Sequence, residues 1–207
     1  MENFIKTYNV SRETFANLET YVSLLKQWQK KFNLVSNSSL EHVWNRHIAD
    51  SAQLFKFLNE EHKRVYDLGS GAGFPALVLS IMAKEVYPQL KFTLIESIAK
   101  KTLYLNEVKT VLNLENVKII NDRAENLKLP VADVITARAV TSLDKLLGFA
   151  APFCSSHTEI IFPKGKSFQS EIDEALKKWH FYIKVVPSEV SEEGVILRIT
   201  NLRRKRK

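Results

Sequence analysis

Apolar residues in the first 60 positions recur every three or four residues, which is the spacing of one helix face. After Ser11, this stripe comprises Phe15, Leu18, Val22, Leu25, Trp28 and Phe32. Ser11 is a suitable N-cap, and Glu13 falls in the first turn. A second helix is predicted from about Ser39, with a slip in the phase of its apolar positions near Ser51. The pattern therefore predicts an N-terminal helical cap over residues 1–60.

From residue 61, short β-rich runs alternate with helical stretches. The predicted strands are Val65–Leu68, Lys91–Ile95, Val117–Ile120, Asp133–Thr136 and Glu159–Phe162, and the predicted helices are Pro75–Val86, Ala99–Leu112, Ser142–Ala151 and Phe168–Trp179. Such alternation is typical of a parallel sheet covered on both faces. The last two runs, Phe181–Val186 and Val195–Thr200, predict an antiparallel hairpin. An α/β fold with a seven-stranded, mostly parallel sheet and this hairpin is typical of Rossmann-like class I methyltransferases, although other doubly wound folds share the pattern.

Length and composition narrow the class of protein. The 207 residues suit one structural domain, divided into the cap, a core over residues 61–202 and a basic tail over residues 203–207. The single cysteine, Cys154, excludes an intramolecular disulfide and a Cys-based zinc site, and no metal site is predicted. The chain shows neither a signal peptide nor an apolar run of the ~18 residues needed to span a membrane. We therefore expect a cytoplasmic protein, and nothing in the sequence requires a partner chain.

Charge is concentrated at the C-terminus. The net charge is +7, and five of these charges belong to Arg203, Arg204, Lys205, Arg206 and Lys207. A basic run of this kind indicates a polyanionic partner such as nucleic acid. A frayed, solvated chain end explains it equally well.

The most informative stretch is a glycine-rich loop between a predicted strand and a predicted helix. Gly69, Gly71 and Gly73 form G-x-G-x-G, with Asp67 two residues before the first glycine. Dinucleotide-binding proteins use G-x-G-x-x-G, which places a pyrophosphate at a helix N-terminus. The form found here favours S-adenosylmethionine, whose ammonium suits an acidic partner. Glu96 ends the second strand and can accept both ribose hydroxyls. The alternative is a tight turn beside a surface glutamate.

The candidate methyl acceptor follows largely from what the chain lacks. Without a Pro-Pro pair, the chain lacks the N/D-P-P-Y/F motif common in enzymes that methylate exocyclic amino nitrogens. Cys154 lies in an apolar stretch and is interpreted as a small buried residue, not as the nucleophile that cytosine C5 chemistry requires. Guanine N7 offers a lone pair and carries no proton, so positioning can suffice without a general base.

Three basic residues follow predicted strands on the ligand side of the sheet. Arg138 follows the fourth strand, and its guanidinium could bind guanine O6 or a phosphate, or it could be a surface arginine. Lys164 and Lys166 follow the fifth strand and could bind phosphates or be solvated loop lysines. The loop Asn121–Glu125, after the third strand, could meet an adenine or simply carry solvated charges.

Several blocks together resemble one family. They are Trp28–Leu34, Arg46–Ser51 (R-H-x-x-D-S), Asp67–Pro75, Leu94–Ser97 with Lys100 and Lys101, Asp122–Glu125, Ala137–Leu143 and Lys164–Gly165. The family is RsmG, also called GidB, whose members methylate guanine N7 in bacterial 16S ribosomal RNA with S-adenosylmethionine. The resemblance implies cofactor contacts at Gly69, Phe74, Ala124, Glu125 and Arg138, and by position at Glu96. Ala72 and Phe74 depart from the Pro and Leu of many members.

The resemblance also suggests that the Arg46–Ser51 helix covers the cofactor pocket, whereas spacing alone lets His47 and Asp50 simply pair. The expected function is methyl transfer to a guanine N7 in small-subunit ribosomal RNA. The expected catalytic residues are Arg138 and Arg123, and the expected RNA contacts are Arg46, Lys164, Lys166, Arg203 and Arg204. The alternatives are a small-molecule methyltransferase, a nucleotide-dependent oxidoreductase and a non-catalytic RNA-binding protein.

Overall fold

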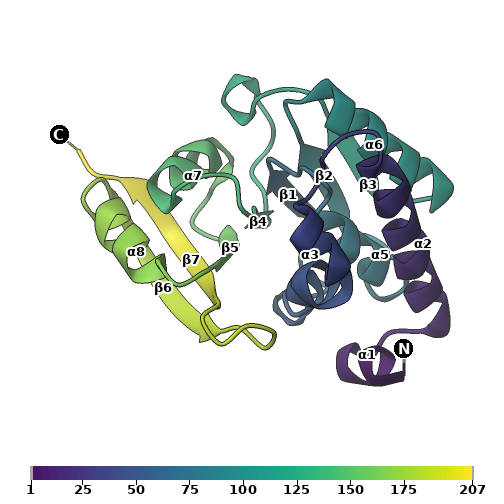
Figure 1. Ribbon diagram of the computed structural model, residues 1–207. Coiled ribbons are helices and arrows are strands. Elements are labelled where there is room, and N and C mark those ends of the chain that lie inside the picture. Colours follow the sequence, from purple (N-terminus) through teal and green to yellow (C-terminus); the bar gives the residue numbers. More distant parts are fainter. Residues whose placement is uncertain (1, 207) are drawn as a thin grey trace.

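The computed structural model describes residues 2–206, which fold around one seven-stranded sheet. The strands are β1 (Arg64–Leu68), β2 (Lys91–Ile95), β3 (Val117–Ile120), β4 (Val134–Thr136), β5 (Glu159–Lys164), β6 (Trp179–Pro187) and β7 (Val195–Arg204). Their order across the sheet is β3-β2-β1-β4-β5-β7-β6 (Figure 1). β1 to β5 pair in parallel, and β7 is antiparallel to β5 and β6. The predicted mostly parallel sheet with an antiparallel hairpin is confirmed.

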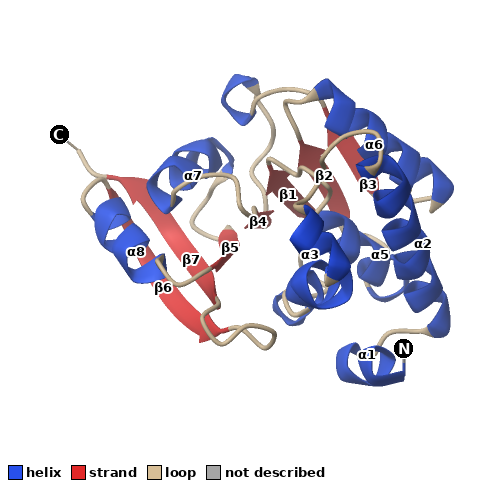
Figure 2. Ribbon diagram, in the orientation of Figure 1, coloured by secondary structure: helices blue, strands red, loops and turns tan. Residues whose placement is uncertain are grey.

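Helices lie on both faces of this sheet (Figure 2). One face carries α2 (Arg12–Gln29), α5 (Ala76–Val86) and α6 (Ala99–Val111), and the other carries α7 (Leu143–Ala150), η4 (Ala151–Phe153) and α8 (Phe168–Leu176). Successive strand residues point to opposite faces. β1 therefore places Val65 in the first core and Tyr66 in the second, and β7 does the same with Ile196 and Leu197. The sheet thus separates two hydrophobic cores.

The N-terminal segment is helical, as predicted, but it consists of short pieces after α2. Ser11 caps α2 by accepting a hydrogen bond from the Thr14 N–H (2.9 Å). The other pieces are α1 (Glu2–Tyr8), α3 (Asn37–Glu41), the π-helix η1 (Trp44–Ala49), α4 (Asp50–Ala52) and the 3₁₀-helix η2 (Phe55–Phe57). The prediction of one continuous helix from Ser39 is wrong, because the wider π-helical turn shifts the phase of the apolar positions. That shift explains the slip noticed near Ser51.

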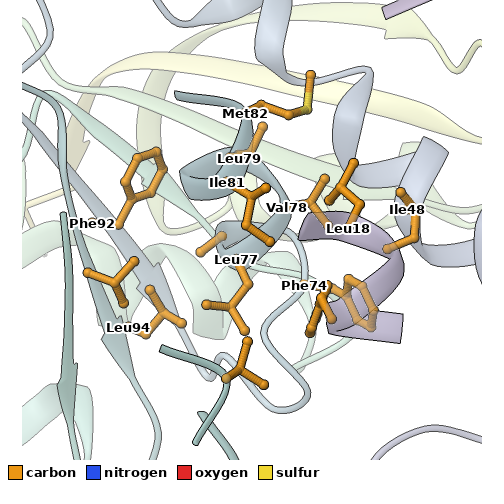
Figure 3. Packing of buried hydrophobic residues seen from close by; sticks show 14 of the residues in the cluster. Leu18, Ile48, Phe74, Leu77, Val78, Leu79, Ile81, Met82, Phe92 and Leu94 are labelled. Carbon is orange, nitrogen blue, oxygen red and sulfur yellow. The ribbon is translucent and has the colours of Figure 1, made fainter. Parts of the chain in front are cut away.

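The first core joins the cap to the sheet (Figure 3). Leu18 of α2 and Ile48 of η1 lie on one side of α5, and Phe92 and Leu94 of β2 lie on the other. The residues Ala76–Ala83 of α5 are all buried. Because this helix is held from both sides, the loop that precedes it is fixed between the sheet and the cap.

Two boundaries near the C-terminus differ from the prediction. α8 ends at Leu176, and Trp179 begins β6 instead of ending the helix. The Trp179 ring is buried, and its Nε1–H donates to Asp144 Oδ1 (2.9 Å), which draws it out of the helix. β7 continues to Arg204, so Arg203 and Arg204 are strand residues and not part of a separate tail from residue 203. They pair with β6, and the Arg204 guanidinium lies over the Trp179 ring (5.7 Å).

Candidate active site

A cleft of about 880 Å³ opens at the C-terminal ends of β1, β4 and β5. One side is formed by the glycine loop, residues 69–74, and Glu96, which together we name the sheet wall; all of these residues except Gly73 line the cleft. The facing side is formed by Asn45, Arg46, His47 and Asp50, mostly in η1, which we name the cap wall. The turn between β6 and β7 and the loop after β5 border the cleft. Ligands of open α/β sheets bind at this edge.

The three glycines of the sheet wall have backbone conformations that residues with a side chain rarely adopt. Gly69, Gly71 and Gly73 have φ values of +68°, +57° and +96°. A Cβ on Gly73 would lie 2.3 Å from Leu77 Cδ1, and a Cβ on Gly69 would lie 2.8 Å from a methyl group of Val140. Next to Gly71, the nearest atom to such a Cβ is 3.8 Å away. The outer two glycines are therefore required for packing, and the middle one leaves room for close approach of a ligand.

Glu96 is buried at the end of β2, and its carboxylate organises the sheet wall. One oxygen accepts from the Gly71 N–H and the other from the Ile98 N–H, both at 2.8 Å. The amide of Asn121 donates to the Glu96 carbonyl (2.9 Å). Each carboxylate oxygen retains a second acceptor site. Glu96 can therefore still accept the two ribose hydroxyls of an adenosyl group, as predicted from its position.

Asp67 lies behind the glycine loop and does not line the cleft. Its side chain is buried, Oδ1 accepts from the Thr136 hydroxyl (2.7 Å), and Oδ2 has no hydrogen-bond partner. Burial raises the pKa of Asp67 to about 7. An oxygen short of a donor fits a site that receives a cationic group. The predicted contact between Asp67 and the cofactor's ammonium stays a prediction.

Arg138 connects the end of β4 to the cap wall. Its Nη1 donates to the Arg46 carbonyl (3.0 Å) and to Asp50 Oδ2 (3.1 Å), and its Nη2 donates to His47 Nδ1 (2.5 Å). The guanidinium carbon also lies 4.8 Å from the centre of the Phe74 ring. Spacing alone allowed His47 and Asp50 to pair with each other, but the structure brings both to Arg138.

His47 is buried between charged and aromatic neighbours. Its ring stacks on Phe74, with the centres 4.7 Å apart, and Nε2 lies 2.9 Å from the Ser39 hydroxyl. Burial, together with the positive charges of Arg138 and Arg46, lowers the pKa of His47 to about 3. The imidazole is therefore neutral at physiological pH.

The structure leaves a second group of predicted residues outside the cleft lining. Ala124 begins η3 (Ala124–Asn126) and is buried, whereas Arg123 and Glu125 are exposed. None of the three is a lining residue, and Arg123 does not share the cleft with Arg138. Their assigned roles in cofactor binding and catalysis stay predictions.

The predicted RNA-binding residues differ in how free their charges are. Lys164 is largely buried and bound to Glu171 (2.7 Å) and to the Thr141 carbonyl (3.2 Å). Lys166 is exposed and pairs with Glu193 (3.0 Å). Arg46 is exposed and lines the cleft. Arg203 and Arg204 lie at the far end of β7 from the cleft.

Sequence reasoning did not identify two polar residues of the cleft. Ser39 contacts His47, and Glu171 holds Lys164 while also accepting from the Leu143 N–H (2.8 Å). Both lie in helical segments of ordinary composition, and only the folded structure shows which residues they contact. No local signal distinguishes either residue.

Other candidate chemistry is weaker. Within residues 2–206, no three His, Cys, Asp or Glu side chains are grouped to hold a metal, and no helix is long and apolar enough to cross a membrane. Burial raises the pKa of Cys154 to about 12, and its thiol donates to the Ala150 carbonyl (3.3 Å). Cys154 therefore stays protonated, as expected for a packing residue.

Comparison with known protein families and sequences points in one direction. The family model described as "GidB: rRNA small subunit methyltransferase G" matches residues 14–195. A Ribosomal RNA small subunit methyltransferase G from Jannaschia sp. (strain CCS1) is 44% identical over 91% of this chain and 89% of its own length. One from Paramagnetospirillum magneticum is 39% identical over 99% of this chain and 97% of its own length.

Solved structures agree on the fold. A SAM-dependent methyltransferase from Aquifex aeolicus superposes with a TM-score of 0.59 at 18% identity, covering 76% of this chain and 91% of its own. The mitomycin 7-O-methyltransferase MmcR gives a TM-score of 0.60 at 12% identity, covering 92% of this chain and 68% of its own. At these identities, the likeness establishes the class I methyltransferase fold.

Proposed function

This chain belongs to the GidB family of rRNA small subunit methyltransferases G, and we propose from that membership that it methylates N7 of a guanine in 16S ribosomal RNA. The enzyme is a methyltransferase whose cofactor is S-adenosyl-L-methionine. Membership of this family excludes the nucleotide-dependent oxidoreductase. The acceptor atom and the RNA contacts are parts of the proposal.

The residues of the sheet wall suit this cofactor. Glu96 would accept the ribose hydroxyls, and the open side of Gly71 allows the ligand to approach the backbone. Asp67 would lie beneath the amino-acid portion, with one oxygen in need of a donor. When bound, S-adenosyl-L-methionine supplies a methyl group on a positively charged sulfur. We place Ala124 and Glu125 at the adenine end on the strength of the family resemblance.

One observation carries the choice of a ring nitrogen as acceptor. Every lining side chain that could act as a base already accepts a hydrogen bond from the protein: His47 from Arg138, Asp50 from Arg138, Glu96 from Gly71 and Glu171 from Lys164. The remaining acceptor sites of Glu96 would be taken by the ribose hydroxyls, so a nucleophile that must lose a proton would lack an uncommitted base. Guanine N7 attacks with a lone pair and needs none, so alignment of the base can supply the catalysis.

Arg138 is the proposed catalytic residue that holds the acceptor base. A guanidinium can donate to guanine O6 or to a phosphate. A donor on N7 would occupy the lone pair that attacks, so a productive contact uses O6 or the backbone. Arg123 is exposed on the loop after β3 and is retained as a proposed catalytic contact to the RNA.

The RNA would lie across the mouth of the cleft. Arg46 is exposed in the cleft lining and Lys166 is exposed next to the lining residue Gly165, so both can contact phosphates, whereas Lys164 would first have to release Glu171. Arg203 and Arg204 would extend the contact along β7. We further propose, as the sequence suggests, that the protein acts in the cytoplasm as a monomer. Light scattering of the purified protein tests the monomer.

The test uses labelled S-adenosyl-L-methionine and three acceptors: small ribosomal subunits that lack N7 methylation, stripped ribosomal RNA, and free nucleosides. Label at a single guanine N7 in ribosomal RNA is expected. Arg138→Ala should abolish transfer, whereas Lys118→Ala, an exposed change on β3, should not alter it. Label confined to a small molecule would overturn the RNA substrate. Cofactor binding without transfer to any acceptor would favour a non-catalytic RNA-binding protein.

A further inference from the structure

Two cap side chains that contact Arg138, those of His47 and Asp50, have no role in the function proposed so far. A guanidinium has five N–H donors, and Arg138 uses three of them on the cap wall. Among residues 2–206, the remaining Nε–H and second Nη2–H have no hydrogen-bond partner. The cap therefore fixes one part of the guanidinium and leaves two donors for a ligand.

The contact with Arg138 determines the tautomer of His47. Arginine only donates, so Nδ1 of His47 must be the acceptor and the ring proton must be on Nε2. Nε2–H then donates to the Ser39 hydroxyl (2.9 Å), which in turn donates to the Ser36 carbonyl (2.8 Å). Stacking on Phe74 fixes the plane of the ring. His47 is thus held as an oriented acceptor.

Asp50 is also fixed by hydrogen bonds to both of its carboxylate oxygens. Its Oδ2 accepts from Arg138, and its Oδ1 accepts from the Gln53 amide (3.0 Å). The Gln53 carbonyl oxygen in turn accepts from the Glu189 N–H (2.8 Å) and the Ser188 hydroxyl (3.3 Å), in the turn between β6 and β7. The carboxylate therefore has one oxygen for Arg138 and one that ties it to the rest of the cleft rim.

We propose that His47 and Asp50 are positioning residues that hold the Arg138 guanidinium against the cap wall and aim its two free donors into the cleft. The inference rests on the proposed function, because it assigns these residues to the group that would hold the acceptor base. It also gives the η1 segment a task beyond covering the pocket. An arginine already oriented before substrate arrives loses little freedom when it binds the base.

The first test is a double-mutant cycle measured as kcat/KM for methylation of small subunits. His47→Leu and Asp50→Asn should each lower kcat/KM at least tenfold. Arg138→Lys keeps a positive charge but lacks the planar fork, so positioning by His47 and Asp50 should count for little. In the Arg138→Lys background, the same two substitutions should therefore change kcat/KM less than twofold. Equal losses in both backgrounds would show a merely structural role and overturn the proposal.

A conservative pair separates positioning from folding. His47→Asn places an amide oxygen near the position of Nδ1, so it should retain more activity than His47→Leu. Urea denaturation of each variant shows whether a loss of activity follows a loss of stability. Glu174→Gln, in the exposed pair with Lys177, is a matched control for removal of a carboxylate and should leave kcat/KM unchanged. Equal activity of His47→Asn and His47→Leu would count against the proposal.

The second test does not depend on activity. Nitrogen NMR of the imidazole in the wild-type protein at neutral pH should show the Nε2–H tautomer of His47, and Arg138→Lys should shift the Nδ1 resonance. An Nδ1–H tautomer would overturn the proposed contact. A wild-type protein that shows this tautomer but methylates no acceptor would overturn the proposed function instead.

Discussion

The sheet wall and the cap wall face each other across one cleft, but different interactions give them their shapes. The shape of the sheet wall depends mainly on its backbone, because three glycines adopt positive φ and Glu96 accepts hydrogen bonds from two backbone N–H groups. In the cap wall, side chains from distant positions converge on Arg138. The first wall is specified by local sequence and the second by tertiary contacts.

This difference bears on how the two walls can change. A glycine at positive φ packed against Leu77 tolerates almost no substitution. The cap wall instead depends on matched partners, so one altered residue leaves the others without their hydrogen bonds. Substitutions in the sheet wall should therefore mainly destabilise the fold, whereas substitutions in the cap wall should first disturb the orientation of Arg138.

The largest expected effect comes from Gly73→Ala. The new Cβ would lie 2.3 Å from Leu77 Cδ1, at a φ of +96°. Backbone strain and overpacking together should lower the free energy of unfolding by about 4 kcal/mol. Gly71→Ala is the matched control, because its Cβ meets no atom closer than 3.8 Å. It should cost only about 1–2 kcal/mol, and equal losses in urea denaturation would contradict the distinction.

Sequence alone predicted the sheet wall well. The spacing of Gly69, Gly71 and Gly73 predicted the loop, because the three glycines act within five consecutive positions. Glu96 added the ligand class, because the next parallel strand ends at the same edge of the sheet. It placed the two flanking strands within one residue of their observed bounds. It also predicted a cofactor contact for Asp67, whose side chain is buried behind the loop, and that contact stays a prediction.

The contacts of the cap wall could not be predicted from the sequence, and the reason is physical. His47 and Asp50 lie three residues apart, which is compatible with a simple pair on a helix. Their common partner, Arg138, lies about 90 positions later, and local spacing says nothing about such a contact. The π-helix η1 also differs from the prediction. Apolar periodicity predicts a regular α-helix, and the extra residue of the π-helical turn shows in the sequence only as a shift in the phase of the apolar positions. Family resemblance identified these residues without explaining them.

Phe74 joins the two walls, and Phe74→Ala has the next largest expected effect. The ring is buried and carries both His47 and Arg138 on its surface. Its removal should lower the free energy of unfolding by about 3 kcal/mol and loosen Arg138. Phe74→Leu keeps most of the volume and should cost less than about 1.5 kcal/mol. Thermal unfolding of both variants checks this, and equal losses would show that packing volume is irrelevant here.

Asp67, directly behind the sheet wall, and His47, in the cap wall, should give opposite dependences of stability on pH. Asp67 has a pKa of about 7 when folded, above its ordinary value of 3.8, so the folded state holds more protons between these values and stability falls as pH rises. His47 has a pKa of about 3, below its ordinary 6.5, so the unfolded state holds more protons and stability rises with pH. Between pH 4 and 6.5, the two trends oppose each other in the wild-type protein.

Single variants should separate these trends. Asp67→Asn removes the contribution that makes stability fall as pH rises. From pH 5 to pH 6.5, the free energy of unfolding of this variant should therefore increase by about 2 kcal/mol more than that of the wild-type protein. His47→Asn removes the rising component and should tilt the curve the other way. Urea denaturation at several pH values measures both slopes. A wild-type slope in the Asp67→Asn protein would show that its carboxyl titrates normally.

The smallest expected effects lie at two exposed cations, Arg46 in the cleft lining and Lys166, which follows the lining residue Gly165. Arg46 forms no ion pair within residues 2–206, whereas Lys166 already pairs with Glu193. If the RNA crosses the mouth of the cleft, Arg46→Gln should reduce the slope of log affinity against log salt by about 0.7, the value for one phosphate on a single strand. Lys166→Gln should reduce it less, because phosphate competes there with a carboxylate. Arg46 contacts Arg138 through its carbonyl, so this substitution should change the free energy of unfolding by less than about 0.5 kcal/mol. An unchanged slope with Arg46→Gln would show that the RNA does not contact the cap wall. The RNA would then be expected to bind along the sheet wall and the turn between β6 and β7.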